Sequence, residues 1–213
     1  MLKYDTVIVA NGEPASHPEA LRILHGARTL VCCDGAAATL LALGMEPTVI
    51  VGDGDSLPSE LAARFADRIV PDRSEEYNDL TKAVNYCEAN GLRRFAIVGG
   101  GGRREDHLLG NISLLVNYSR KFEVVMVTNF GVFTPIHTTT TFKCPVGQPV
   151  SVFSFTPETR LSYHNLHYPA SLRRFAQLWE GTLNITDADT FTIELHDTGD
   201  IVVYQAFTNN DND

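Results

Sequence analysis

The feature that most constrains the fold of this sequence is an alternation, up to about residue 128, of short apolar runs with stretches of helical periodicity. The runs are brief and rich in β-branched or apolar residues, as strands buried on both faces are: Thr6–Ala10, Thr29–Cys33, Thr48–Val51, Phe95–Val98 and Val124–Val127. Apolar residues recur at helical spacing between later runs, at Leu80, Ala83, Val84 and Cys87, and again at Leu108, Ile112, Leu115 and Val116. This alternation predicts an α/β fold with a mostly parallel sheet and helices on both of its faces.

The pattern changes after Thr128. Proline and glycine now separate short strand-like runs. Thr138–Thr141 is β-branched and polar, Val150–Phe155 is typical of a strand, and two further runs alternate like half-buried strands, at Thr190–Leu195 and Ile201–Ala206. We therefore predict two domains, an α/β domain over residues 1–128 and a smaller antiparallel β domain over residues 129–213. A short helix is also considered at Leu172–Leu178, and the tail Asn209–Asp213 is expected to fray.

The charge balance restricts the partners of the chain. Its 17 basic and 26 acidic residues leave a net charge of −9, which repels the phosphate backbone of nucleic acids. The basic residues are scattered rather than gathered into one patch, so we expect no nucleic-acid partner. No run approaches the roughly 18 apolar residues of a membrane span. The apolar part of the N-terminus is too short for a signal peptide, so we also expect no membrane association.

The cysteines indicate a reducing compartment. Cys32 and Cys33 lie in an apolar strand-like run, and Cys87 lies on the apolar face of a predicted helix. Together with Cys144 they show neither metal-ligand spacing nor a dense disulfide framework. Buried reduced thiols are typical of cytoplasmic proteins, and we expect that location.

Acidic residues follow predicted strands at the points where the strands end. Asp34 follows the second strand, Asp53 and Asp55 follow the third, and Asp79 opens the next helical stretch. Ligands bind at the carboxyl ends of the strands in an open parallel sheet, so we expect these carboxylates at one edge. Like charges there repel by about 1–4 kcal/mol per pair, and oxygen ligands alone favour Mg²⁺. The sequence thus predicts a magnesium site, although each aspartate alone is also typical of a turn, a solvated loop or a helix N-terminus.

A glycine-rich loop follows the strand Phe95–Val98. Gly99–Gly102 permits close backbone approach, and a helix is expected from Asp106, so that its free amides face the loop. An arginine in the following Arg103-Arg104 pair can hold phosphate oxygens. The loop is interpreted as a phosphate site, with a flexible surface loop as the alternative. Neither G-x-x-x-x-G-K-[ST] nor an early G-x-G-x-x-G is present, which argues against a P-loop kinase or an NAD enzyme.

Three more polar side chains are candidates for the same region. His107 and Asn111 are four residues apart and are expected on one helix face, where His107 could also have only a capping role. Lys82 follows Asp79 by three residues and can face it. It forms either a surface ion pair or a lysine shared between that carboxylate and a phosphate.

Taken together, these segments resemble the thiamin pyrophosphokinase family. Each motif is short, but their order and spacing over nearly the whole chain are specific. The motifs are Cys33-Asp34-Gly35-Ala36-Ala37, Gly52-Asp53-Gly54-Asp55-Ser56, Asn78-Asp79-Leu80-Thr81-Lys82-Ala83, Gly102-Arg103-Arg104-Glu105-Asp106-His107 with Asn111, and Glu180-Gly181-Thr182-Leu183-Asn184.

The resemblance implies an α/β domain that binds ATP and magnesium, followed by a β-sandwich that binds thiamin. It implies a magnesium-dependent transfer of a pyrophosphoryl group from ATP to thiamin, giving thiamin diphosphate and AMP. It further implies a homodimer whose active sites lie between the α/β domain of one subunit and the β domain of the other.

The resemblance also implies a role for each candidate residue. The catalytic acidic positions are Asp34, Asp53, Asp55 and Asp79, of which the last three hold the metal. The ATP and phosphate positions are Lys82, Arg104, Asp106, His107 and Asn111. The thiamin positions, contributed by the partner subunit, are Tyr168, Thr182 and Asn184.

The chain departs from the family pattern at several positions. Ala36 and Ala38 replace a glycine and an asparagine, Asn78 replaces a threonine, Arg103 replaces a glycine, and Ile185 replaces an acidic residue. These departures bear on substrate contacts more than on the reaction, because the four aspartates and Arg104 are present. Two alternatives are a nucleotide-sugar glycosyltransferase, since Asp53-Gly54-Asp55 is an Asp-x-Asp element, and a non-catalytic nucleotide-binding module.

Overall fold

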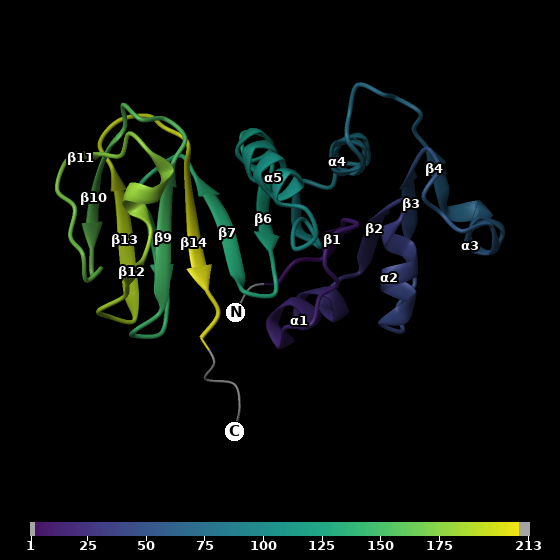
Figure 1. The fold of residues 1–213 in the computed structure, drawn as a ribbon, viewed down its shortest axis with the longest axis horizontal. Helices are drawn as coiled ribbons and strands as arrows, with labels where there is room; N and C mark the ends of the chain where they lie inside the picture. The colour runs from purple at the N-terminus through teal and green to yellow at the C-terminus, as the bar shows by residue number, and fades with distance from the viewer. Residues whose placement is uncertain (1–2, 209–213) are drawn as a thin grey trace. The chain divides into compact units, whose positions relative to one another are not determined.

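The structure is a computed structural model that describes residues 3–208, so the predicted fraying of Asn209–Asp213 lies outside the described residues. The chain divides into two compact units, one ending at Asn129 and the other beginning at Phe130 (Figure 1). Among the described residues, no helix combines the length and the apolar character needed to cross a membrane.

The first unit is built on a parallel sheet in the order β6-β5-β1-β2-β3-β4. Its strands are β1 (Thr6–Val9), β2 (Thr29–Cys33), β3 (Val49–Gly52), β4 (Ile69–Pro71), β5 (Arg94–Val98) and β6 (Glu123–Val127). Every residue of β1 and β3 is buried, which explains why these strands read as unbroken apolar runs. The predicted parallel sheet is confirmed in this unit. Its edge strand β4 was not predicted, because it is three residues long and mostly exposed.

Helices cover both faces of this sheet, as predicted. Figure 1 shows α4 and α5 on one face and α1 and α2 on the other. The helices are α1 (Pro18–Gly26), α2 (Ala36–Ala42), α3 (Ser59–Arg64), α4 (Asp79–Ala89) and α5 (Glu105–Tyr118), with a 3₁₀ turn η1 (Ala66–Arg68).

The strand order reverses next to β1. The chain runs outward from β1 to β4, and α4 then returns it to β5 on the other side of β1. Right-handed crossovers place the helices before and after such a reversal on opposite faces. The carboxyl ends of β1, β2 and β5 therefore border a crevice where ligands bind in open sheets of this kind.

The two helices beside the reversal follow from local sequence. The Asn78 side chain caps α4 by accepting the amide of Thr81 at 2.9 Å. The predicted apolar stripe of α4 is buried, at Leu80, Ala83, Val84 and Cys87. In α5, Leu115 and Val116 are buried, whereas Leu108 and Ile112 are only partly covered.

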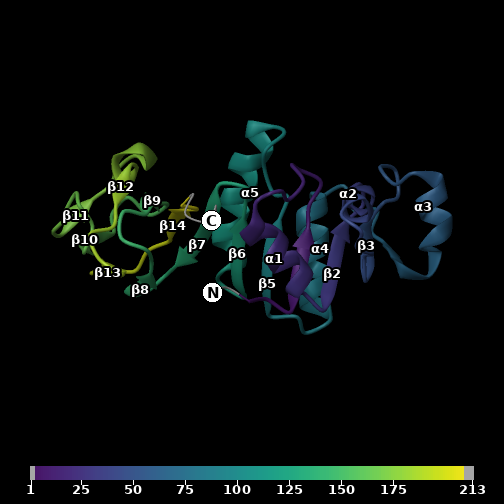
Figure 2. The same cartoon turned by 90° about the horizontal axis from the view of Figure 1, so that it is seen from below.

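The second unit is an antiparallel β-sandwich, which Figure 2 shows as two layers. One sheet has the order β12-β9-β14-β7 and the other β11-β10-β13-β8. The strands are β7 (Gly131–Ile136), β8 (Thr140–Lys143), β9 (Pro149–Ser154), β10 (Arg160–His164), β11 (Arg173–Arg174), β12 (Asn184–Ile185), β13 (Thr190–Leu195) and β14 (Ile201–Ala206). The core between the sheets includes Phe142 stacked on Phe191, with ring centroids 5.0 Å apart.

The helix considered at Leu172–Leu178 is wrong. Arg173 and Arg174 form β11 and pair with β10, and a 3₁₀ turn, η2, begins only at Leu178 and ends at Gly181. Leu172 has a φ of 50°, which is incompatible with a right-handed helix. Pairing with a distant strand therefore overrode a weak local pattern.

We expect Phe191→Ala to lower the free energy of unfolding by about 3–5 kcal/mol, because the ring is fully buried and its removal leaves a cavity. Urea unfolding followed by circular dichroism measures the change. The matched control is Phe130→Ala, whose ring is 67% exposed and whose loss should cost under about 1 kcal/mol. Equal losses in the two variants would contradict the proposed core.

Candidate active site

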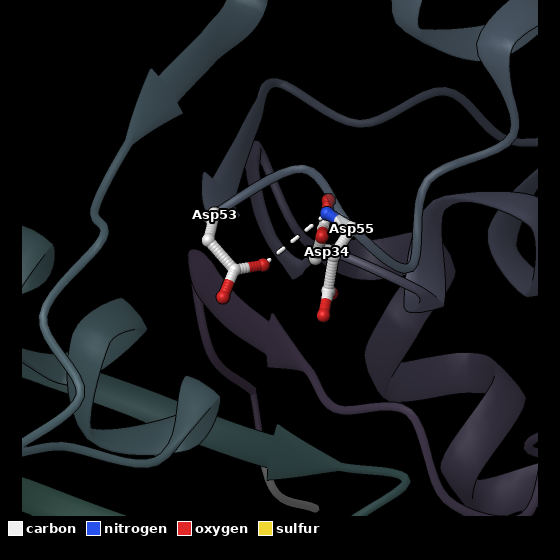
Figure 3. Close-up of side chains that lie close together, drawn as sticks. All are labelled: Asp34, Asp53 and Asp55. Atoms are coloured by element: carbon white, nitrogen blue, oxygen red, sulfur yellow. Dashed lines mark hydrogen bonds between the residues drawn. The ribbon is translucent and has the colours of Figure 1, made fainter.

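Three predicted site carboxylates meet at the carboxyl edge of the parallel sheet. One ligand oxygen from each of Asp34, Asp53 and Asp55 lies within 4.8 Å of the other two. Figure 3 shows these side chains together, with the Asp55 amide donating to Asp53 Oδ1 at 3.2 Å. Asp34 is buried, while Asp53 and Asp55 are exposed. The cluster is therefore closed on the side of Asp34 and open to solvent on the side of Asp53 and Asp55.

Asp34 shapes the loop that carries the other two aspartates. Its Oδ2 atom accepts the backbone amides of Gly54 at 3.0 Å and Ser56 at 3.2 Å. The loop can approach this closely because residue 52 is a glycine: a Cβ there would lie 2.6 Å from the Asp34 Cβ. The buried carboxylate thus organises the backbone of residues 52–56.

The pKa values of Asp34 and Asp53 are shifted in opposite directions. Burial raises the pKa of Asp34; the amides of Ser56 and Gly54 oppose this rise, and the nearby Asp53 and Asp79 carboxylates add to it. The Asp55 amide lowers the pKa of Asp53, and the positive charge of Lys82 lowers it further. Asp53 is accordingly held in its charged form more firmly than Asp34.

Asp79 lies beside this cluster and is connected to it through Lys82. The Lys82 Nζ atom is 3.2 Å from Asp79 Oδ1 and 3.8 Å from Asp53 Oδ2. The ion pair with Asp79 that the sequence suggested is therefore present, but the Lys82 side chain is only 5% exposed, so the lysine is buried rather than on the surface. Burial lowers the pKa of Lys82, but the carboxylates of Asp79, Asp53 and Asp72 outweigh it and raise the pKa. The lysine therefore stays charged and holds two of the predicted site aspartates.

The loops after β1 and β5 are joined by backbone hydrogen bonds. The Gly12 amide donates to Gly99 O at 2.8 Å, and the Glu13 amide donates to Gly101 O at 2.7 Å. A Cβ on Gly12 would lie 2.2 Å from Gly99 O, so only glycine allows this contact. These hydrogen bonds connect the glycine-rich run to the loop after β1, so that the run forms a wall.

This wall borders a pocket of about 340 Å³ at the reversal of the strand order. The pocket is lined by the ends of β1, β2 and β5 and by the first turns of α4 and α5, including Asn11, Asn78, Asp79, Gly99–Gly101, Arg103, Arg104, His107 and Asn111. The Asn111 side chain donates to Gly100 O at 2.7 Å and so fixes the wall. Asp79 lines the pocket and also contacts Lys82, so it connects the pocket with the carboxylate cluster.

The two arginines at the pocket have different partners. Arg104 donates through Nε and Nη2 to both carboxylate oxygens of Asp106, at 3.1 and 2.6 Å, which lowers the pKa of Asp106. Arg103 donates through Nη1 to the backbone oxygen of Asn11 at 3.2 Å and to its Oδ1 at 3.3 Å. Asn11 was overlooked in the sequence, although Asn11-Gly12 directly follows the first predicted strand.

The three predicted thiamin residues lie in the second unit. Tyr168 is 59% exposed, and its backbone is held by the buried Asn184. Asn184 Oδ1 accepts the Tyr168 amide at 3.0 Å, and Asn184 Nδ2 donates to Tyr168 O at 2.8 Å. Thr182 Oγ1 donates to Trp179 O at 2.7 Å. Asn184 thus positions Tyr168, whose ring is open to solvent.

One exposed aromatic residue in this unit was not predicted. The Trp179 ring, on η2, is 69% exposed, and its Nε1 donates to Gln177 Oε1 at 3.0 Å. A single tryptophan in a polar stretch carries no periodicity, so no sequence pattern identified it.

Two protein-family models together match most of the chain. The thiamin pyrophosphokinase catalytic domain matches residues 20–127, and the thiamin pyrophosphokinase substrate-binding domain matches residues 131–204. No curated protein sequence matches the chain.

Solved structures with this fold include three thiamin pyrophosphokinases. That of Geobacillus thermodenitrificans is 24% identical, with a TM-score of 0.79 over 96% of this chain and 98% of that one. That of Candida albicans is 15% identical, with a TM-score of 0.80 over 95% and 90%. The yeast enzyme is 17% identical, with a TM-score of 0.76 over 95% and 86%. At these identities the structures establish the shared fold, and the two domain matches establish the family.

We expect Asp34→Asn to raise the free energy of unfolding at pH 7. Because burial raises the pKa of Asp34, its charge disfavours the folded state above the usual carboxyl pKa, and the effect disappears below it, where both states are protonated. Both amides donate to one oxygen, which asparagine can replace with its carbonyl. The gain should therefore vanish as the pH falls below about 4. Urea unfolding as a function of pH measures it.

Asp197→Asn is the control of opposite sign. The hydrogen bond from Arg160 lowers the pKa of Asp197, so this carboxylate stabilises the folded state above its unfolded pKa and the contribution is lost as the pH falls. Its amide variant should lose stability at pH 7. If Asp34→Asn also lowered the free energy of unfolding at pH 7, this result would contradict the inference that the buried Asp34 charge disfavours the folded state.

Proposed function

The chain belongs to the thiamin pyrophosphokinase family, and on that premise we propose that it catalyses the magnesium-dependent transfer of a pyrophosphoryl group from ATP to thiamin. The observation that carries the proposal is the meeting of Asp34, Asp53 and Asp55 at the sheet edge. Asp79 connects this cluster with a glycine-walled pocket of the size and polarity that a nucleotide requires.

The carboxylate cluster suits Mg²⁺. It offers oxygen atoms only, and its separations of up to 4.8 Å are short enough for one ion to contact several of them after small side-chain adjustments. We propose that Asp53 and Asp55 hold the ion, with Asp79 or Asp34 completing the site. When bound, the ion supplies positive charge for the ATP phosphates.

The remaining groups of the first unit would bind and orient ATP. The pocket wall at Gly99–Gly101 permits close approach of phosphates, and α5 begins at the pocket with the partial positive charge of a helix N-terminus. We assign Lys82, Arg104, Asp106, His107 and Asn111 to this region. Lys82 acts on it through Asp79 and Asp53, because its own side chain is buried between them.

The reaction follows from that alignment. The primary hydroxyl oxygen of thiamin bonds to the β-phosphorus of ATP, and the bond from that phosphorus to the oxygen bridging it to the α-phosphate breaks. AMP leaves with the bridging oxygen, and an aspartate of the cluster accepts the hydroxyl proton. Such transfers require mainly alignment and charge neutralisation, so no covalent enzyme intermediate is needed.

Tyr168, Thr182 and Asn184 are proposed as the thiamin residues of the second unit. An exposed Tyr168 ring is available for stacking on a pyrimidine, and Asn184 holds the Tyr168 backbone from both sides. The comparisons do not support a nucleotide-sugar glycosyltransferase or a non-catalytic module.

We further propose a cytoplasmic homodimer in which each active site combines the first unit of one subunit with the second unit of its partner. The free thiols of Cys32, Cys33, Cys87 and Cys144 support the location. The family resemblance supports the dimer.

We expect Asp55→Asn to lower kcat by about 100-fold or more, because it removes one charge that would hold the metal at the phosphates. Formation of thiamin diphosphate and AMP from ATP and thiamin, titrated with Mg²⁺, measures the loss. The matched control is Asp67→Asn, which changes an exposed aspartate on η1 and should leave turnover unchanged. Near-normal activity of Asp55→Asn would remove Asp55 from the metal site.

A second test concerns the shared site. We expect Tyr168→Ala to raise the KM for thiamin. At a low thiamin concentration, the Tyr168→Ala homodimer and the Asp55→Asn homodimer should therefore both be inactive. Heterodimers of the two, co-expressed with different tags and purified through both, should recover about half the wild-type rate, because one of their two sites is intact. A monomer in gel filtration, or inactive heterodimers, would contradict a site shared between subunits.

A further inference from the structure

Arg104, the arginine that the family resemblance assigns to the phosphates, is already compensated within the chain. Its guanidinium forms a bidentate pair with the carboxylate of Asp106, two residues along. Both side chains are largely exposed, so the pair is weak, but a phosphate would have to compete with an adjacent negative charge. Arg104 therefore brings less net positive charge to the pocket than an arginine without a carboxylate partner would.

Arg103 lines the same pocket and has no such partner. It is exposed, and among the described residues no carboxylate forms an ion pair with it. Its contacts are the two oxygen atoms of Asn11, both reached from Nη1. Since a guanidinium carries five N–H donors, most of them remain available to a ligand.

Asn11 holds Arg103 at the pocket wall. Asn11 lies two residues after the end of β1, and its side chain fills the space beside Gly35, where a Cβ would lie 2.3 Å from Asn11 Nδ2. One side chain thus contacts the loops after β2 and β5. The hydrogen bonds to Asn11 hold Arg103 in place, and because Asn11 is neutral they do not offset the arginine's positive charge.

Other charged groups at the pocket form ion pairs with one another. Asp79 is paired with Lys82, and the Arg104 charge is matched by Asp106. Of the two arginines that line the pocket, Arg104 forms an ion pair with a carboxylate and Arg103 forms none with any of the described residues.

We propose that Arg103 binds the phosphate tail of the nucleotide and sets the preference of the pocket for a triphosphate over a monophosphate. The planar fork of the guanidinium suits two phosphate oxygens at once. The inference rests on the proposed function, and it assigns a role to a position where the family pattern has a glycine, which offers no charge.

Isothermal titration calorimetry with ATP, AMP and adenosine, in the presence of Mg²⁺ and without thiamin, tests the proposal. Arg103→Ala should weaken ATP binding by about 10- to 100-fold, the worth of a charge-assisted hydrogen bond. AMP should lose less affinity, and adenosine should bind as to wild type. Arg103→Lys should retain part of the ATP affinity, since it keeps the charge and loses the fork.

Arg93→Ala is the matched control. Arg93 precedes β5, at the end of the strand away from the pocket, and pairs with Glu88 at 3.5 Å. Its removal should leave all three affinities unchanged. Wild-type ATP affinity in Arg103→Ala would overturn the proposal, as would an equal loss for ATP, AMP and adenosine, which would indicate a distorted pocket.

The same samples separate this inference from the proposed function. If the wild type binds ATP through Arg103 but forms no thiamin diphosphate, the acceptor is wrong and the role of Arg103 stands. If turnover is normal and Arg103→Ala binds ATP as tightly as the wild type, only the role of Arg103 falls. Failure of the wild type to bind ATP would overturn both.

Discussion

The candidate site depends on one buried carboxylate. Asp34, at the end of β2, accepts two backbone amides from the loop after β3, and this contact brings Asp53 and Asp55 within reach of a single cation. A charge buried in this way disfavours folding, and proteins retain such groups where function requires them. The glycine at position 52 is part of the same arrangement, because any side chain there would collide with Asp34.

The second constraint is charge compensation in an acidic protein that would bind a polyanion. A net charge of −9 repels phosphates at long range, so local cations must hold them. The three cations near the site are deployed differently. Lys82 is buried beside two aspartates and offsets part of their charge, Arg104 forms an ion pair with Asp106, and Arg103 lines the pocket and donates to Asn11. The carboxyl edge of the sheet thus has an acidic region suited to a metal ion and, beside it, a pocket with arginines suited to phosphates.

Much of the architecture could be predicted because the interior strands and the apolar stripe of α4 are set by burial, which leaves a periodic trace in the sequence. The edge strand β4 left no such trace, and the helix considered at Leu172–Leu178 gave way to pairing between β10 and β11. The strand ends identified the aspartates and the resemblance assigned their roles, but neither could indicate that Asp34 rather than Asp79 joins the close group. Asn11 was overlooked for the same reason, since its partners Gly35 and Arg103 are distant in the sequence.

The sequence by itself determined the parallel sheet, the change to an antiparallel β domain and the placement of acidic residues at strand ends, because each depends on local patterns of burial and turn chemistry. Only the tertiary structure decided which charges are compensated. Lys82 could have been a surface residue, and Arg103 and Arg104 are indistinguishable as neighbours in the chain. Their roles differ because burial and the proximity of carboxylates, which no spacing rule reports, set the availability of each charge.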